Sequence, residues 1–381
     1  MTKEKIEKPI LLLVDGHSLA FRSFYAFSNS REGGLMTKEG IPTSVTFGFL
    51  KSLLDNCKNL SPQGITIAFD TAEPTFRHKA DPNYKANRDV APEVFFQDLA
   101  QLQEIIANHL NISICTAPGY EADDVLGTLA NKASTEGWQV RILTGDRDLF
   151  QLVDDSRNIA VLYMGGGPYG KSGNPQLIKE AEVNEKLGVS PTKVVDLKAL
   201  TGDSSDNIPG VKGVGPKTAI TLLKENGDLD GIYISLAELE RDTGQSVKGC
   251  IKGALKEKLT KDKKNAYLSK KLAKIIIEVP IPQIPVLRLG TVDIKGLKIS
   301  LEELELNSLA RQIPLIKATF SSGGYLANKK GIETTNEAAN TSKEVNVINN
   351  VSSISSNSIP TLQPKIIANE FLIQELVNKL M

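Results

Sequence analysis

Nine acidic residues of this chain stand where an apolar run ends or where a helix or turn begins. A solvated acidic face would place its carboxylates at helical spacing, whereas these follow runs of buried character or open new elements. Carboxylates gathered in this way repel one another unless cations lie among them. The pattern therefore predicts a fold that brings several strand ends together around divalent metal. The nine residues are Asp15, Asp70, Glu121, Asp123, Asp124, Asp146, Asp148, Asp203 and Asp206.

Short apolar runs alternate with longer helical patterns through the first part of the chain. Such alternation is typical of an α/β domain with a mostly parallel central sheet. In these sheets ligands bind beyond the carboxyl ends of the strands, where Asp15, Asp70 and Asp146 are expected. Strands are predicted at Ile10–Val14, Ile65–Phe69, Ile112–Cys115, Val140–Leu143 and Ile159–Tyr163, and helices around Thr43–Cys57, Phe95–His109 and Asp123–Ser134.

The later part of the chain changes character twice. From about Ser190 the pattern becomes helical and rich in lysine, which predicts a second, smaller helical domain. After about Phe320 the composition shifts to Ser, Asn, Thr and Gly, which is typical of a disordered linker too polar to pack. The predicted divisions are an α/β core at 1–188, a helical domain at 189–318, a linker at 319–364 and a short apolar-patterned end at 365–381.

The composition argues against several classes of protein. The 45 basic and 45 acidic residues cancel, so local clusters, not net charge, must indicate any polyanionic partner. Three cysteines form no CxxC pair and three histidines are scattered, which argues against a disulfide framework and against zinc. The sequence has no leader-like segment and no stretch of 18 apolar residues, so we expect a soluble, cytoplasmic protein with no membrane partner.

The segment EADD at 121–124 is the strongest local signal of a metal site. Three carboxylates within four residues destabilise a helix start unless the helix dipole or a cation compensates them. Glu121 and Asp123 would point apart if both were helical, so Glu121 is expected before the first turn. N-capping by Asp123 or Asp124 is the plainer interpretation, but it explains one carboxylate and not three. Asp124 is expected to reach metal only through water.

Two further acidic pairs lie on turns. In TGDRD at 144–148, Asp146 and Asp148 follow a predicted strand, and extended geometry would point both to one side with Arg147 facing away. An Asp-rich turn without metal is the alternative. Asp203 and Asp206 of GDSSDN form the second pair and open the next motif.

The segment IPGVKGVGPKTA at 208–219 predicts contact with a nucleic-acid backbone. Its glycines allow close approach to phosphate, and the helix that follows offers free N–H groups. A mononucleotide P-loop would need a buried strand before it, so a helix-hairpin-helix that grips duplex without reading sequence fits better. The residues expected to bind DNA here are Gly210, Lys212, Gly213, Gly215, Lys217 and Thr218. By contrast, GGGPYG at 165–170 is expected to be a flexible turn with no cofactor.

The segment FRHKADPNYKANRD at 76–89 mixes cations with aromatic residues. A solvated basic face is the plainer interpretation, whereas the interleaved aromatics favour unpaired nucleic acid, with Tyr84 stacking on bases. Lys85 and Arg88 share a face if the segment is helical. Arg77 and Lys79 are expected to track phosphates beside them.

Five motifs of the chain resemble, in order and spacing, the 5′-nuclease (flap endonuclease) domain of bacterial DNA polymerase I. They are VDGHSLAFR, FD with FRHKADPNYKANRD, GYEADDVLGTLA, LTGDRDLFQLV and LTGDSSDNIPGVKGVGPKTA. The resemblance covers about residues 9–290 and is highly specific. It implies a PIN-like α/β nuclease core, an arch over the site at about 71–96, and a helical domain whose helix-hairpin-helix, at about 203–225, holds downstream duplex.

The resemblance also implies roles for individual residues. Lys85 and Arg88 match arch cations that contact the scissile phosphate, and Arg22 matches a basic position near the site. Asp124 and Asp203 match outer-shell carboxylates. The ligands of the first metal would be Asp15, Asp70, Glu121 and Asp123, and those of the second Asp123, Asp146, Asp148 and Asp206.

The activity that the resemblance implies is metal-dependent 5′-3′ exonuclease and flap endonuclease hydrolysis of DNA, as in removal of RNA primers and flaps during replication and excision repair. All-oxygen ligation suits two Mg²⁺ ions, with Mn²⁺ as a substitute, and K⁺ is expected at the helix-hairpin-helix. The partner would be DNA with a 5′ flap or a 5′ end at a duplex junction, bound by a monomer. No acidic motif position is substituted, which argues against a catalytically dead homologue.

Two other functions stay open from the sequence alone. One is a non-catalytic, structure-specific DNA-binding module that uses metals only to hold its substrate, and the other is an RNA-directed nuclease on a related core. Residues 366–380 resemble the start of a truncated proofreading-like domain. The chain is therefore expected to be the N-terminal part of a DNA polymerase I, a truncated gene product or a stand-alone nuclease, and these 381 residues are expected to lack polymerase activity.

Overall fold

The computed structural model describes residues 8–28, 34–165, 174–241, 251–281 and 287–321. Three predicted features fall outside these ranges: most of the glycine-rich segment, nearly all of the linker, and the apolar-patterned end. Within the described ranges, no helix is long and apolar enough to cross a membrane.

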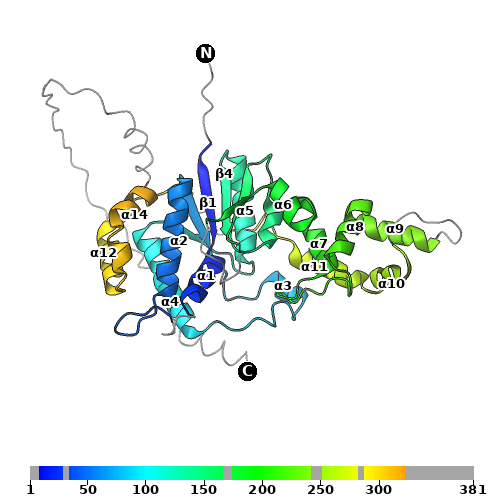
Figure 1. Ribbon diagram of the computed structural model, residues 1–381, viewed down its shortest axis with the longest axis horizontal. Coiled ribbons are helices and arrows are strands. Elements are labelled where there is room, and N and C mark those ends of the chain that lie inside the picture. The colour runs from blue at the N-terminus through cyan, green and yellow to red at the C-terminus, as the bar shows by residue number, and fades with distance from the viewer. Residues whose placement is uncertain (1–7, 29–33, 166–173, 242–250, 282–286, 322–381) are drawn as a thin grey trace, which may run out of the picture. The chain divides into compact units, whose positions relative to one another are not determined.

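A six-stranded sheet in the order β3-β2-β1-β4-β5-β6 lies at the centre of the α/β part, and only the β5–β6 pair is antiparallel (Figure 1). Strand β1 is a continuous apolar run because helices cover both faces of the sheet. The five predicted strands are confirmed to within one residue at each end, whereas the sequence pattern does not predict β6. The strands are β1 (Ile10–Asp15), β2 (Gly64–Ala68), β3 (Ser113–Cys115), β4 (Gln139–Thr144), β5 (Ile159–Tyr163) and β6 (Gln176–Ile178).

Different helices cover the two faces of the sheet. Leu12 and Val14 of β1 pack with apolar residues of three helices, α1, α2 and α4, while Leu11 and Leu13 pack with those of α5. The sequence pattern does not predict α1, since the first helix it indicates lies around Thr43–Cys57. The bounds are α1 (Gly16–Ser28), α2 (Ser44–Leu60), α4 (Glu93–Glu104), which continues into the π-helix η1 (Ile105–His109), and α5 (Ala122–Thr135).

The second part of the chain is helical, as predicted. Helix α7 packs against α8 and α11, and α9 packs against α8 and α10. The turn between α7 and α8 carries most of the segment at 208–219. The two helices and this turn give the region its helix-hairpin-helix form. The helices are α6 (Glu180–Leu187), the 3₁₀ turn η3 (Pro191–Lys193), α7 (Val194–Thr201), α8 (Pro216–Asn226), α9 (Leu229–Arg241), α10 (Gly253–Lys261) and α11 (Lys263–Ala273).

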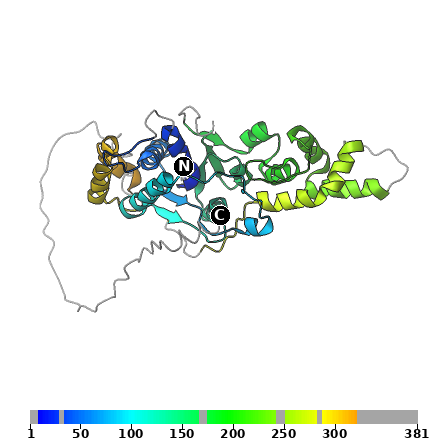
Figure 2. The same ribbon diagram turned by 90° about the horizontal axis from the view of Figure 1, so that it is seen from below.

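The last described helices do not belong to this helical body, which corrects the predicted division at 189–318. They pack on α2 and η1 of the α/β core (Figure 1; Figure 2). Their side chains Leu297, Leu301 and Phe320 are buried there. The physical reason is the path of the chain after α11: it runs back along α5, where the backbone N–H groups of Ile276 and Val279 bond to α5 side chains. This path brings the last helices back to the α/β core. These helices are α12 (Ile294–Glu303), α13 (Asn307–Ala310) and α14 (Ile313–Phe320).

Candidate active site

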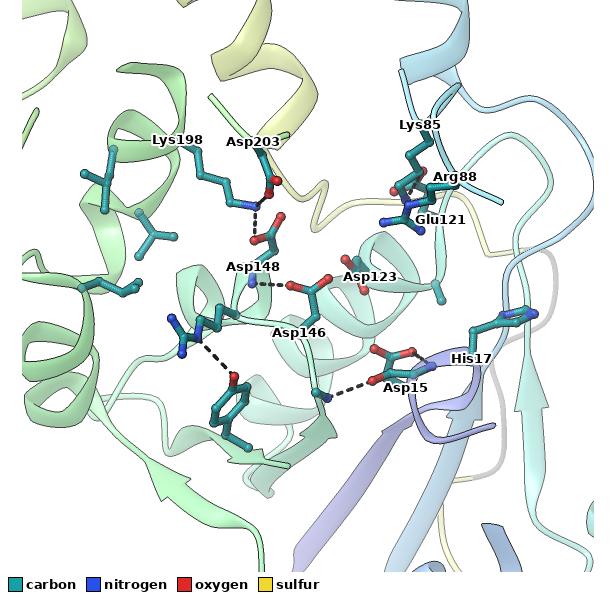
Figure 3. Close-up of a pocket in the computed structure, with 18 of the residues that line it drawn as sticks. Asp15, His17, Lys85, Arg88, Glu121, Asp123, Asp146, Asp148, Lys198 and Asp203 are labelled. Atoms are coloured by element: carbon teal, nitrogen blue, oxygen red, sulfur yellow. Dashed lines mark hydrogen bonds and ion pairs between the residues drawn. The ribbon is translucent and has the colours of Figure 1, made fainter. Parts of the chain in front are cut away.

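An open, acid-lined pocket of about 980 Å³ lies at the carboxyl ends of the central strands (Figure 3). Asp15 is the last residue of β1, while Asp70 and Asp146 follow β2 and β4 by two residues. The strand order reverses at β1, which lies between β2 and β4, and such a reversal is where open α/β sheets bind their ligands. The three predicted strand-end carboxylates are therefore brought together in one pocket. The other acidic residues that line it are Glu121, Asp123, Asp148 and Asp203.

Asp15 is fixed by the elements around it. Its carboxylate accepts hydrogen bonds from Ser18 N at 3.0 Å and from Thr144 Oγ1 at 2.7 Å. Gly16 follows it because a Cβ there would lie 2.4 Å from a ring carbon of Phe69. Burial, with repulsion from Asp70 and Asp146, raises the pKa of Asp15 to about 6 against these hydrogen bonds. A nearby cation would relieve that strain on the ionised form.

The start of α5 separates the three carboxylates of EADD. Glu121 is the N-cap residue with extended backbone, before the first turn as expected, and its side chain lines the pocket. Asp123 also faces the pocket, where burial and the neighbouring Asp15 and Asp146 raise its pKa well above the usual range. Asp70 accepts a 2.7 Å bond from Ala122 N and so ties this helix start to the end of β2.

Asp124 does not face the pocket, which corrects its prediction as a metal-site residue. It is fully buried and forms a two-point ion pair with Arg77, at 2.7 and 2.8 Å. Arg77 belongs to α3 (Phe76–Ala80), is 2% exposed, and also donates to Leu272 O and Lys274 O. The prediction that Arg77 tracks DNA phosphate is therefore wrong in this structure. The pair fastens three segments together behind the pocket.

Asp146 and Asp148 reach the pocket by a turn and not by the predicted extended strand. Asp148 N donates to Asp146 Oδ1 at 2.8 Å, and Asp148 opens the 3₁₀ helix η2 (Asp148–Leu152). Arg147 lies over the Tyr163 ring and donates to its hydroxyl. Burial, with repulsion from Asp146, raises the pKa of Asp148 to about 7. Both carboxylates line the pocket in spite of the different backbone.

Lys198 is a pocket residue that the sequence motifs do not indicate. It projects from α7, pairs with Asp148 and lies 2.6 Å from an oxygen of Asp203 (Figure 3). The hydrogen bonds from Lys198 and Ser205 keep the pKa of Asp203 low, at about 2, although burial acts to raise it. His17 also lines the pocket, and its Nδ1 accepts from Asp70 N at 3.1 Å. Lys198 joins the acids only in the fold, whereas His17 lies two residues after Asp15 within the motif VDGHSLAFR, where the sequence prediction does not include it.

The segment Asp81–Arg88, which we call the strap, lies against the loop before the hairpin. Lys85 Nζ donates to Glu121 at 2.9 Å, and the guanidinium of Arg88 pairs with Asp206. Asp206 is buried and is reached from the strap on its backbone as well, because Lys85 N donates to its carbonyl. The strap therefore lays its two cations on carboxylates that the sequence predicts to be metal ligands.

Tyr84 is buried, so its prediction as an exposed stacking residue is wrong in this structure. It is 3% exposed and packs with Ile208 and Leu272. Its hydroxyl donates toward Glu121 at 3.1 Å and lies 3.4 Å from Asp206. The side chain thus fixes the strap to two acidic segments and presents no ring face to solvent. Lys79, by contrast, is exposed on α3.

The hairpin between α7 and α8 is held from α10 and α11. Gly210 is buried and donates its N–H to Ser269, so it is not free to bind phosphate and its predicted role is corrected. Gly213 has a positive φ of 77°, and Lys258 Nζ donates to its carbonyl at 3.1 Å. The N–H of Lys212 is also taken, by Asp262. Of the predicted DNA-binding residues here, Lys212, Gly213, Gly215 and Lys217 are exposed and Thr218 is half-buried at the start of α8.

Arg22 is the remaining predicted residue. Its Nη1 donates to Met164 O at 3.0 Å, just after β5. It is half-buried on α1 and does not line the pocket. The structure therefore places Arg22 beside the end of β5 and outside the lining of the acidic pocket.

The pocket is suited to hard cations by the chemistry of its donors. Seven carboxylates line it, and oxygen ligands are those that Mg²⁺ and Mn²⁺ prefer. Repulsion among Asp15, Asp123 and Asp146 favours added positive charge. As it stands, the described part of the chain has no three acidic, histidine or cysteine side chains close enough together to hold an ion. Lysine and arginine side chains lie on several of these carboxylates, and the site would have to rearrange to accept metal.

Comparison with known proteins gives two adjoining family matches. Residues 10–188 match the 5′-3′ exonuclease, N-terminal resolvase-like domain, and residues 189–295 match the 5′-3′ exonuclease, C-terminal SAM fold. Among curated relatives, DNA polymerase I of Synechocystis sp. is 46% identical over 88% of this chain, and that of Thermus aquaticus is 40% identical over 81%. The chain spans only 32% and 33% of the length of these two relatives.

Solved structures share the fold at low sequence identity. T5 5′-exonuclease with bound zinc has a TM-score of 0.55 and 19% identity, covering 81% of this chain and 99% of that one. The catalytic core of Rad2 in complex with DNA substrate has a TM-score of 0.54 and 18% identity, covering 81% and 93%. At this identity the likeness shows the fold alone, and it confirms the predicted α/β core with a following helical region.

Proposed function

Because this chain belongs to the 5′-3′ exonuclease family, we propose that it is a hydrolase that cuts DNA phosphodiester bonds as a metal-dependent 5′-3′ exonuclease and structure-specific flap endonuclease. The family match confirms the resemblance of the five sequence motifs. The chain corresponds to the nuclease third of the DNA polymerase I relatives, so a role in removing primers or flaps in replication and repair is part of the proposal.

One observation carries this proposal: seven carboxylates from separate segments converge in a single pocket at the carboxyl edge of the sheet (Figure 3). Gathering like charges costs stability, and burial and mutual repulsion raise the pKa of Asp15, Asp123 and Asp148. Bound cations would offset this repulsion, so the cluster is explained as a metal-binding site. The alternative of a solvated acidic face does not explain why these groups line a pocket.

The carboxylates and the basic side chains of the pocket would have different roles in hydrolysis. Asp15, Asp123 and Asp146 at its centre would hold two Mg²⁺ ions, with help from the other lining carboxylates, and Mn²⁺ could replace Mg²⁺. Bound divalent ions supply Lewis-acid stabilisation of the phosphodiester and an activated water. Lys85 and Arg88 on the strap would then neutralise phosphate oxygens beside the acids.

Duplex binding is assigned to the hairpin and α8. Lys212 and Lys217 are exposed there, and the first turn of α8 directs N–H groups outward from its start at Pro216. This grip would position a 5′ end or a 5′ flap so that the junction with duplex reaches the pocket. K⁺ at the hairpin is also part of the proposal, but Lys258 already donates to the Gly213 carbonyl, so K⁺ binding there would have to displace its ammonium.

The structure of T5 5′-exonuclease, which has a similar fold, contains zinc, whereas we propose Mg²⁺ or Mn²⁺ for this chain. The reason is the donor set, because the pocket offers carboxylate oxygens, a single imidazole at His17 and no thiolate. The two described cysteines, Cys57 and Cys115, are buried elsewhere. We expect faster cleavage with Mg²⁺ or Mn²⁺ than with Zn²⁺ when the metals are compared at equal concentration.

The experiment that tests the proposal uses the purified chain with a 5′-labelled flapped duplex, a blunt duplex and a single strand, each with and without Mg²⁺. We expect metal-dependent cleavage of the flapped duplex near its junction, leaving a 5′-phosphate on the shortened strand. Tight binding of the flapped duplex without any cleavage in Mg²⁺ or Mn²⁺ would leave a non-catalytic DNA-binding module as the function.

A further inference from the structure

Basic side chains lie on carboxylates of the acidic pocket and on Asp206, which the sequence predicts to be a metal ligand. Lys85 pairs with Glu121, Arg88 with Asp206, and Lys198 bridges Asp148 and Asp203. The first two cations belong to the strap and move with it. Lys198 differs because it stands on α7 and reaches across the pocket from the opposite side (Figure 3).

We propose that Lys198 is an internal counter-ion of the metal-free protein, and that a divalent ion binding at Asp148 must first displace its ammonium. This inference rests on the proposed function, since it assumes metal binding in the same pocket. The inference goes beyond the proposed function because it gives the metal site an internal competitor, the ammonium of Lys198. The metal-free pocket would then be held in a neutralised form until metal arrives.

The geometry supports a competing role for Lys198. Its side chain is 19% exposed, and those of Asp148 and Asp203 are 14% and 21% exposed, so the three groups are shielded from bulk water. Shielded charges interact more strongly than surface pairs. An ammonium and a divalent ion cannot both occupy the same face of Asp148, because their charges repel at that distance. One must leave when the other binds.

The remaining contacts show what would happen on exchange. Asp203 keeps two further hydrogen bonds, from Ser205 N at 2.8 Å and Ser205 Oγ at 2.6 Å, so it stays in place without Lys198. Asp148 N still donates to Asp146, which keeps the acidic turn formed. The displaced ammonium would remain in the pocket, where the phosphate of a substrate provides new negative charge. Metal and phosphate binding should therefore strengthen each other, as linkage requires.

The test measures metal binding without DNA or catalysis. Mn²⁺ is titrated calorimetrically into wild-type protein and into Lys198→Met, which keeps the aliphatic stem and removes the charge. We expect the variant to bind Mn²⁺ at least about tenfold more tightly, because a competing positive charge is gone from a shielded site. Circular dichroism establishes that the variant is folded.

Lys270→Met is the matched control. Lys270 also bridges two carboxylates, those of Asp196 and Asp230, at 2.9 and 3.5 Å, and it lies outside the acidic pocket. Its loss should leave Mn²⁺ affinity unchanged. If both variants tighten binding equally, the effect is one of net charge, and the specific exchange at Asp148 is overturned.

The remaining outcomes separate this inference from the proposed function. Unchanged or weaker Mn²⁺ binding by Lys198→Met would overturn the exchange and make Lys198 a group that positions the carboxylates. Absence of Mn²⁺ binding by the wild-type protein would instead contradict the proposed function itself. A crystal structure with Mn²⁺ gives an independent readout, in which Lys198 Nζ is expected to have left Asp148; an intact pair beside bound Mn²⁺ would also overturn the inference.

Discussion

At the scale of single residues, the burial of a charge decides its role more than its position in a motif. Asp123 and Asp124 are adjacent, yet one lines the pocket and the other is enclosed with Arg77 behind it. The sequence identifies the acidic cluster but does not show which member turns inward, because one step along a helix rotates the side chain by about 100°. The direction of Asp124 depends on Arg77, which is 47 residues away.

Because Arg77 pairs with Asp124 in the interior, substitution of Arg77 should lower the stability of the fold. Substitution of a residue that only contacts DNA would not have this effect. Arg77→Met leaves Asp124 as an unpaired charge with no exposed surface, and the free energy of unfolding should fall by about 3–5 kcal/mol. Chemical denaturation measures this change. Lys79→Met is the control on the same helix, since Lys79 is exposed and its loss should change stability by less than about 0.5 kcal/mol. Equal stability of the two variants would contradict the structural role of Arg77.

At the scale of elements, the start of α2 depends on a residue from another helix. Its N-cap residue, Thr43, makes no side-chain capping bond. Asp98 of α4 instead accepts from Val45 N at 2.6 Å and from Thr46 N at 3.0 Å. Because this cap comes from 52 residues away, no local sequence signal could reveal it.

Removal of this cap gives a prediction at the same scale. Asp98→Ala should lower the free energy of unfolding by about 2–3 kcal/mol, because two helix N–H groups lose their acceptor in a buried position. Urea denaturation followed by circular dichroism measures the loss. Asp55→Ala, which removes exposed ion pairs with Lys51 and Lys58 on α2, should cost no more than about 0.5 kcal/mol. Similar urea midpoints and slopes for the two variants would contradict the role of Asp98 as the cap of α2.

The elements that the sequence does and does not predict differ in physical kind. Strand β1 is predicted because it is buried on both faces and so forms a continuous apolar run. Strand β6 (Gln176–Ile178) is missed because it is short, at the sheet edge and mostly exposed. The turn of Asp146 and Asp148 is placed correctly along the chain but with the wrong backbone, since a strand pattern does not show where the strand ends.

At the scale of the whole molecule, α12, α13 and α14 complete the α/β core although they follow the helical region in sequence. Leu297, Leu301 and Phe320 are each 2% exposed or less and belong to the same cluster as Leu12 and Val14 of β1. The sequence shows that these residues are helical and apolar, but not which part of the protein they cover. That depends on the return path of the chain along α5.

This arrangement predicts the effect of shortening the chain. A form ending after residue 321 keeps all three helices, and a form ending after residue 292 removes them and exposes the apolar face of α2 and η1. We expect the shorter form to melt at a temperature lower by more than about 5 °C than the longer form, or to aggregate. Scanning calorimetry of the two forms measures the difference. Equal melting temperatures would show that these helices are not part of the core.

The central claim is that the acidic pocket is a metal-dependent active site, and Asp146→Ala tests it most directly. Asp146 lies in the middle of the pocket but outside the hairpin and the strap. With a 5′-flapped duplex in Mg²⁺, the variant should lose at least about 10³-fold in cleavage rate while it still binds the duplex within a few-fold of wild type. Cleavage at a wild-type rate would contradict the account, because the central carboxylate would then have no part in the chemistry.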